Sequence, residues 1–250
     1  MVSTPLNQLL VIDIETACSH PSYADLPETW KTLWEEKVSR NLPEGINADE
    51  WYGARAGVMA EFARVVCVSM AIFTGSAEKP GLKLRSVSNA DEKQLLTELI
   101  SVLENLKNAG RNFCFAGHNI REFDIPFLCR RMIIHGITIP SCMDFQNKKP
   151  WEVNMVDTFQ YWRFGDFKNF TSLKLLAAAL SLPSPKDDLD GSMVSPLFWE
   201  RDPAIQQQNL ERIVAYCEKD VLTTANIIMR FRNESPIELE NVEGQTVTGA

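Results

Sequence analysis

The chain has 250 residues, is 45% hydrophobic and carries a formal net charge of −8, which suits one large domain or two small ones. The acidic balance disfavours a protein that coats long duplex DNA, for which a basic surface is expected. No segment approaches the roughly 20 apolar residues of a membrane-spanning helix, and the first residues lack a secretory signal pattern. The six cysteines form no CxxC pair. This argues against a zinc site and predicts reduced thiols in a cytoplasmic protein without membrane contact.

The hydrophobic pattern predicts an α/β chain in which three strands come first and helices then alternate with short strands. A long insertion lies between the first two strands, at about residues 17–62, and a Pro-, Asp- and Gly-rich loop covers 183–194. We predict one domain over residues 1–232 and a mobile, acidic tail over 233–250. The predicted strands are 8–15, 65–73, 82–87, 113–116 and 154–157, and the predicted helices are 26–40, 51–64, 91–106, 123–135, 171–180 and 203–231.

Two carboxylates interrupt the apolar first strand. Side chains two residues apart on a strand share a face, so Asp13 and Glu15 project together beside chain that is expected to be core. Burial of two like charges is costly unless a cation lies between them, and an all-oxygen pair suits Mg²⁺ or Mn²⁺. The pair alone leaves a second interpretation open, in which the strand end reaches solvent and both acids are hydrated.

Three further acids stand out by their context. Asp124 follows a buried strand and opens a helix, where it is either a helix cap or a carboxylate directed at a site beyond the strand ends. Tyr216 and Asp220 share one face of the last helix, at the rim of its apolar stripe, although a surface acid beside a core-edge tyrosine is common. Asp157 ends a short strand, as a cap or as an outer member of a carboxylate cluster.

Together these residues form three motifs in chain order: Asp13-x-Glu15, Asn119-x-x-x-Phe123-Asp124 and Tyr216-x-x-x-Asp220. Their order resembles the exonuclease motifs of the DEDD superfamily, and the tyrosine before the last aspartate marks its tyrosine branch. That branch includes the proofreading domains of family B DNA polymerases. Residues 59–69 look like the second strand of those domains, and the loop 186–194 is similar to one in bacterial stand-alone polymerase-B-like exonucleases.

The resemblance implies a ribonuclease H-like α/β fold with a five-stranded mixed sheet flanked by helices. It implies a metal-dependent 3′-5′ exonuclease that hydrolyses terminal phosphodiesters of single-stranded nucleic acid, DNA favoured, to nucleoside 5′-monophosphates. The implied cofactors are two divalent ions, Mg²⁺ or Mn²⁺, which clamp the attacking and leaving oxygens. The implied partners are single-stranded 3′ ends, and the sequence indicates no particular protein partner.

The resemblance also implies roles for individual residues. Asp13 would bridge both metals, while Glu15 and Asp220 would complete the site whose metal activates water. Asp124 would hold the second metal through water. Tyr216 would orient the attacking water, because a usual pKa of about 10 makes it a poor base. The expected substrate-binding residues are Thr16, Asn119, Phe123 and Lys186, and Asp157 is expected as an outer support.

A single strand is usually held by aromatic platforms and local positive charge. The candidates along the chain, whose aromatics also suit the core, are Phe123, Phe127, Trp162, Phe167 and Phe170, with Arg163, Lys168 and Lys174. His118 either braces its loop or touches substrate. The insertion either forms a lid or extends the surface.

Other functions stay open on the sequence alone. The chain could be an inactive nucleic-acid-binding module of the same fold. It could instead be an RNA-directed exonuclease, which depends on whether the site accepts a 2′-hydroxyl. Phosphatase chemistry on nucleotides is a third alternative.

Overall fold

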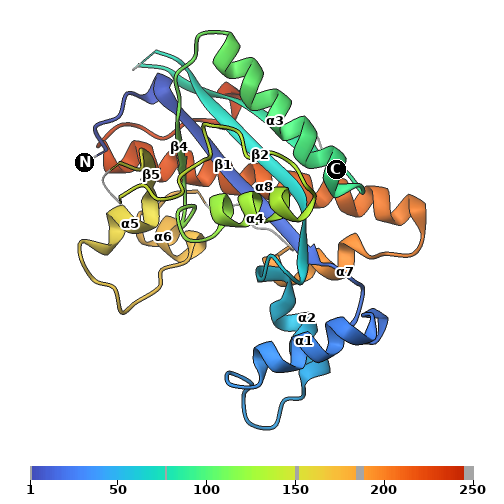
Figure 1. Cartoon of the computed structure of the whole chain (residues 1–250). Helices are drawn as coiled ribbons and strands as arrows, with labels where there is room; N and C mark the ends of the chain where they lie inside the picture. Colours follow the sequence, from blue (N-terminus) through green and yellow to red (C-terminus); the bar gives the residue numbers. More distant parts are fainter. Residues whose placement is uncertain (1, 77, 150–151, 184–188, 245–250) are drawn as a thin grey trace.

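The computed structural model describes residues 2–76, 78–149, 152–183 and 189–244, and its centre is a six-stranded mixed sheet (Figure 1). The strands are β1 (Leu9–Cys18), β2 (Ala63–Gly75), β3 (Pro80–Ser88), β4 (Cys114–Gly117), β5 (Met155–Asp157) and β6 (Val242–Glu243). Their order is β5-β4-β1-β2-β3-β6. β2 is antiparallel to β1 and β3, β4 is parallel to β1 and β5, and β6 is parallel to β3. The five strands expected from the sequence are thus present in one mixed sheet, with the two-residue β6 added.

Helices cover both faces of this sheet. The α-helices are α1 (Glu28–Val38), α2 (Ala48–Arg55), α3 (Glu92–Asn108), α4 (Asp124–Ile134), α5 (Thr158–Arg163), α6 (Leu173–Ala179), α7 (Val194–Phe198) and α8 (Pro203–Phe231), with 3-10 turns η1 (Leu6–Gln8), η2 (Tyr23–Asp25), η3 (Ala56–Val58), η4 (Gly191–Met193) and η5 (Leu239–Asn241). On one face Leu10, Ile12 and Ile14 share a core with residues of α3 and α4. On the other face Leu9 and Val11 pack with residues of α8. Because both faces are covered, β1 is apolar on both sides apart from its acids.

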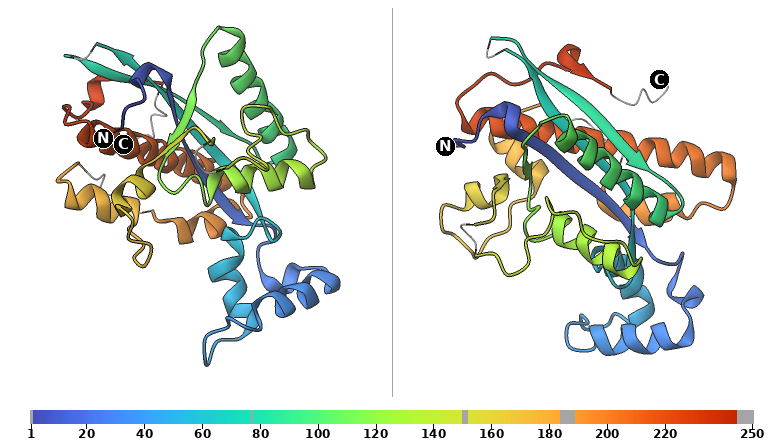
Figure 2. Two further views of the ribbon diagram at one scale, coloured as in Figure 1. Left: turned by 60° about the vertical axis from the view of Figure 1, so that its left-hand side comes forward. Right: turned by 45° about the horizontal axis from the view of Figure 1, so that its top comes forward.

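The insertion forms a small lobe with a core of its own. The views in Figures 1 and 2 agree that α1 and α2 lie beyond the end of β1, away from the α5–α6 segment. Trp34, Tyr52 and Phe62 are buried together, with the Trp34 ring 5.3 Å from Tyr52 and 5.1 Å from Phe62 in edge-on contacts. Such aromatic contacts stabilise a small core beyond the area they bury.

Several element boundaries differ from the sequence prediction. The helix predicted over 51–64 ends at Arg55. The last residues of the predicted helix belong to a strand instead, because β1 continues to Cys18 and pairs there with Ala63 of β2. The short helices α5 and α7 were not predicted, because segments of 6 and 5 residues carry no helical period.

The start of the predicted mobile tail packs on the fold instead. The buried Ile237 donates its backbone N–H to Asn226 Oδ1 of α8 at 2.7 Å, and β6 pairs with Leu82 and Lys83 of β3. The sequence did not predict this contact, because the segment is polar and a two-residue strand is too short to show hydrophobic alternation. The boundary of the domain at residue 232 stays a prediction.

All six cysteines are unpaired, and four of them are buried. Among the described residues, no helix combines the length and the apolar character needed to cross a membrane.

A buried ion pair joins α3, α4 and β2. Glu92 accepts hydrogen bonds from Arg131 Nε at 2.8 Å and Nη2 at 2.5 Å, and from the backbone N–H of Val65 at 2.7 Å. His135 Nε2 lies 2.7 Å from the same carboxylate. Burial alone would raise the pKa of Glu92, but the hydrogen bonds and charge of Arg131 lower it. The carboxylate is therefore charged and fully paired in the core.

We predict that Glu92→Gln lowers the free energy of unfolding by about 3–5 kcal/mol, because it leaves the Arg131 guanidinium buried without its counter-charge. Chemical denaturation measures this loss. The matched control is Glu98→Gln on the same helix, whose carboxylate forms an exposed ion pair with Arg85 at 3.5 Å and should cost less than about 1 kcal/mol. Equal losses in the two variants would contradict the assignment.

Candidate active site

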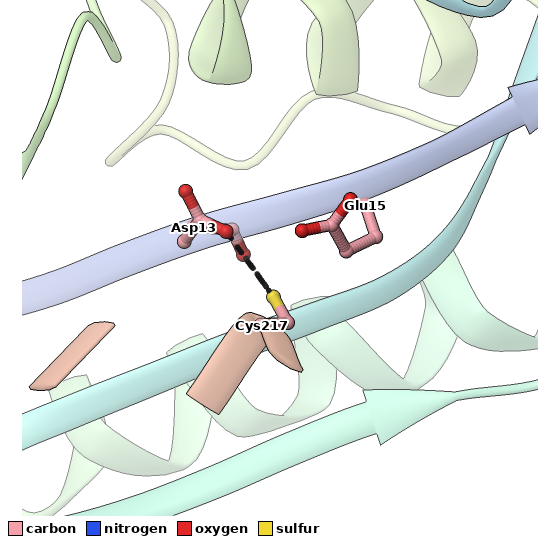
Figure 3. A group of neighbouring side chains, drawn as sticks. All are labelled: Asp13, Glu15 and Cys217. Atoms are coloured by element: carbon pink, nitrogen blue, oxygen red, sulfur yellow. Dashed lines mark hydrogen bonds between the residues drawn. The ribbon is translucent and has the colours of Figure 1, made fainter. Parts of the chain in front are cut away.

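β1 carries Asp13 and Glu15 on the face that packs against α8 (Figure 3). The pairing of β4 with β1 covers only Leu9 to Val11, so the acids lie beside a stretch of β1 that β4 does not reach. On the other side β2 pairs with the whole stretch, with a register shift between Glu15 and Thr16. Irregularities of this kind often redirect side chains next to functional sites.

Asp124 reaches the unpaired side of β1 from the first turn of α4. Its Oδ1 accepts the backbone N–H of Ile14 at 3.1 Å, between the two acids of β1. The approach of β4 requires Gly117, because a Cβ there would lie 2.8 Å from the carbonyl oxygen of Ile12 and 2.0 Å from Ile120 Cγ2. Two roles were predicted for Asp124, a helix cap and a carboxylate directed at a site. The contact with Ile14 places its carboxylate beside the strand that bears Asp13 and Glu15.

α8 brings the third motif to the same place. The hydroxyl of Tyr216 donates to Asp220, one turn further along the helix. Between them Cys217 contacts β1, with its Sγ 3.4 Å from the carbonyl oxygen of Asp13 and 3.3 Å from its Oδ2 (Figure 3). One ligand atom each of Asp13, Glu15 and Cys217 lie within 4.8 Å of one another. Three segments distant in sequence therefore converge.

Burial and mutual repulsion dominate the electrostatics of this group. Burial, followed by the charges of Asp124, Asp220 and Glu15, raises the pKa of Asp13 well above its usual range. Burial and the charge of Asp220 do the same to the pKa of Glu15. Burial raises the pKa of Asp124 to about 7, although hydrogen bonds from backbone N–H groups oppose this. Among the described residues, no basic side chain lowers the pKa of Asp13, Glu15 or Asp124.

This donor set fits divalent cations. The carboxylate oxygens are hard ligands of the kind that Mg²⁺ and Mn²⁺ prefer. No described basic side chain balances the charge of Asp13 or Glu15. The groups that shift their pKa values are other acids, together with the thiol of Cys217 for Asp13 and that of Cys67 for Glu15. Bound cations would remove the repulsion that raises the pKa of each acid. Asp13, Glu15, Asp124 and Asp220 are the residues that would hold them.

Asp157 organises the loop before α4. Its Oδ1 accepts the backbone N–H groups of Asn119 at 2.9 Å and Phe159 at 3.0 Å, and its Oδ2 accepts that of Arg121 at 3.1 Å. The first of these residues has a φ of 64°, which asparagine tolerates better than most residues. Asp157 therefore caps α5 and at the same time fixes the turn that leads into Asp124.

His118 braces the same loop. Its Nε2 contacts the carbonyl oxygen of Thr171 at 2.9 Å, and its Nδ1 contacts the hydroxyl of Thr158 at 2.9 Å. Burial lowers its pKa, which favours the neutral ring. Both ring nitrogens are used within the protein, so the geometry supports the bracing role among the two predicted.

The predicted substrate-binding residues have mixed surroundings. The Thr16 hydroxyl donates to the carbonyl of Gly57 at 2.6 Å, and therefore ties β1 to the insertion. The Phe123 ring packs on the core, 5.4 Å from the ring of the buried Phe127. Asn119 keeps a buried Oδ1 that has no hydrogen-bond partner among the described residues, which leaves an acceptor available. Lys186 lies outside the described residues.

Cys217 was missed as a member of the site. The sequence assigned it to the apolar stripe of the last helix, and it is indeed fully buried. Its position three residues before Asp220 was the only available signal, because residues three apart lie on the same side of a helix. Its thiol donates to the Asp13 carboxylate and opposes the rise in the pKa of that acid.

A comparison with protein families gives the class of protein to which the chain belongs. Residues 58–242 match a family described as predicted 3′-5′ exonucleases related to the exonuclease domain of PolB, and the chain belongs to this family. The matched stretch includes Asp124, Tyr216 and Asp220, whereas Asp13 and Glu15 precede it. In the structure Asp13 and Glu15 lie next to the matched stretch, because Asp124 contacts the strand between them.

Among solved structures, the chain is similar to the family B DNA polymerase of the hyperthermophilic archaeon Pyrobaculum calidifontis, with 17% identity and a TM-score of 0.48. The similarity covers 91% of this chain and 25% of the polymerase chain. No match was found among curated proteins.

The raised pKa values predict how the stability of the metal-free protein depends on pH. A carboxyl whose pKa is higher in the folded than in the unfolded chain keeps a proton that the unfolded chain has released. Stability should therefore fall as pH rises from about 4, the unfolded pKa, through about 7, the folded pKa of Asp124. We expect a slope of about 1.4 kcal/mol per pH unit for each such proton, measured by denaturation in a chelator.

Asp13→Asn should flatten this dependence, and Mn²⁺ should reverse it. The control Glu240→Gln changes an exposed carboxylate on η5 and should leave the slope unaltered. A metal-free protein that grows more stable between pH 5 and 8 would contradict the electrostatic account.

Proposed function

We propose that this protein is a metal-dependent 3′-5′ exonuclease of the tyrosine branch of the DEDD superfamily. It hydrolyses the terminal phosphodiester of single-stranded nucleic acid, with DNA as the favoured substrate, and releases nucleoside 5′-monophosphates. The observation that carries the proposal is the hydrogen bond of Asp124 to Ile14, which brings a carboxylate from mid-chain between Asp13 and Glu15. Membership of the PolB-related family supports the direction of hydrolysis.

The acids have separate tasks in this proposal. When bound, two divalent ions would supply charge neutralisation and stabilise the oxygens that attack and leave. Asp13 is central among the acids, because its pKa responds to Asp124, Asp220 and Glu15 together. Asp13 would therefore contribute to holding both ions. Glu15 and Asp220, whose charge raises the pKa of Glu15, are proposed to hold the ion beside the attacking water.

Tyr216 acts as a hydroxyl that orients water. Burial, followed by the charges of Asp220, Glu15 and Asp13, raises its pKa above the usual value of a tyrosine. The side chain therefore stays neutral over the physiological range and cannot serve as the general base. The Tyr216 hydroxyl donates its proton to Asp220. This leaves the lone pairs of the tyrosine oxygen to accept a hydrogen bond from water.

Cys217 is a positioning residue in this scheme. Its thiol contacts both the carbonyl oxygen and the carboxylate of Asp13, so it links the last helix to the first strand at the reacting centre. The weak S–H donor favours the charged form of the Asp13 carboxylate without adding charge.

The test is hydrolysis of 5′-labelled single-stranded DNA and RNA with Mg²⁺ or Mn²⁺. We expect stepwise shortening of DNA from the 3′ end, and a loss on the order of 10³-fold or more in Asp13→Ala, which removes electrostatic stabilisation of the transition state. The variant should stay folded, because the change relieves repulsion. Glu44→Ala, an exposed acid of the insertion, is the matched control.

Preferential shortening of RNA would instead establish the RNA-directed alternative. Binding without shortening in either metal would establish an inactive module. Release of inorganic phosphate from nucleotides, with oligonucleotides left intact, would support the phosphatase alternative.

Tyr216→Phe should lower kcat by about tenfold, because one orienting hydrogen bond is worth about 1.4 kcal/mol. The pH dependence of kcat should keep its shape, since the tyrosine does not titrate in the reaction. Tyr23→Phe is the control, because its hydroxyl bonds Glu35 on the insertion. An unchanged rate in Tyr216→Phe would remove this hydroxyl from the mechanism.

A further inference from the structure

The segment after α5 exposes an unusual group of aromatic rings. The side chains of Phe164, Phe167 and Phe170 are 93%, 73% and 66% exposed. We call residues 164–170 the aromatic loop. Exposed apolar side chains scattered singly need no explanation, but a contiguous group usually marks a binding surface. Three exposed phenylalanines occur here within seven residues of sequence, and the ring of Phe170 also lies 5.0 Å from that of the buried Phe159.

The conformation of Phe164 is costly for the fold. It ends α5 in the left-handed region, with a φ of 45°, at a position where glycine or asparagine is usual. A bulky residue with positive φ is an outlier. The ring gains little packing in return, because it is almost fully exposed. Backbone strain that brings no packing benefit indicates a role in function, such as the binding of another molecule.

Three cations lie in or beside the aromatic loop, and one of them, Arg163, is paired with Glu122. Arg163, Lys168 and Lys174 flank or lie within it, and Asp166 is its one acid. The Asp166 carboxylate is engaged by the backbone N–H of Lys168 at 2.9 Å and by the side chain of Asn169 at 3.0 Å. Lys168 makes no ion pair with another described residue. The Arg163 guanidinium lies 5.3 Å from the Phe167 ring centroid. Interleaved rings and cations are typical of surfaces that hold single strands.

The residues on either side of the aromatic loop contact the turn that precedes Asp124. Glu122, two residues before Asp124, accepts hydrogen bonds from Arg163 at 3.0 Å and from Gln160 at 2.8 Å. At the other end of the loop, the carbonyl of Thr171 bonds His118 of the same turn. Both views in Figure 2 show the segment that contains α5 and α6, in yellow to orange, well apart from the insertion. Both ends of the loop are therefore held to the turn that leads into Asp124.

We infer that the aromatic loop is a base-stacking platform that holds the single strand upstream of the 3′ end. The inference rests on the proposed function and names the residues that bind its substrate. The rings of Phe164 and Phe167 stack on successive bases, and Lys168 neutralises the phosphates between them. Because every base has a π-face, such a platform tolerates any sequence.

The test measures binding of a labelled deoxythymidine strand longer than about 16 nucleotides and of the same strand built from abasic units, both in chelator so that no turnover is needed. We expect the native protein to bind the base-bearing strand about tenfold or more tightly than the abasic strand. Phe164→Gly and Phe167→Ala should each remove most of this difference. Ile133→Ala is the matched control, because it removes a 57% exposed apolar side chain from α4.

A second measurement separates binding from a structural role. Phe164→Gly should raise the melting temperature while it weakens binding, because glycine adopts the positive φ without strain. A lower melting temperature together with unchanged base discrimination would overturn the inference. So would sedimentation of the native protein as a dimer that Phe164→Gly dissociates, since the rings would then be a contact between copies. Base discrimination without hydrolysis in any metal would support the platform and refute the exonuclease.

Discussion

The side of β1 that β4 does not reach is the constraint on which the site depends. β4 stops pairing at Val11, and the next buried backbone donor, the N–H of Ile14, is satisfied by a carboxylate instead of a strand. A strand in that place would have excluded Asp124 from the acids of β1. The same contact that satisfies the backbone therefore assembles the acidic group, at the expense of like-charge repulsion within the fold.

This repulsion explains the architecture around the site. Acids that destabilise one another must be held by supports that do not depend on them, and Asp157 and the Glu92–Arg131 pair supply these. Asp157 accepts two backbone N–H groups of the turn before α4, and Glu92 joins α3, α4 and β2. The stability gained there permits a site whose acids repel one another, which is a common relation between stability and activity.

Much of this arrangement was predictable from local pattern. Alternation in a strand placed Asp13 and Glu15 on one side, and helical spacing placed Tyr216 on the side of Asp220. Two features were not predictable, for physical reasons. The contact of Cys217 with Asp13 depends on how α8 packs against β1, which a residue's own neighbours in sequence do not encode. The exposure of Phe164 contradicts its apolar character, and strain of this kind is visible only in the backbone.

The central claim is that four carboxylates from distant segments enclose a pair of divalent ions. The most direct measurement is anomalous diffraction from crystals grown with Mn²⁺ and a nucleoside 5′-monophosphate. The account predicts two anomalous peaks about 3.5–4 Å apart, with Asp13 as a ligand of both. A single ion, or ions bound elsewhere while Asp13 and Glu15 remain without metal, would contradict it.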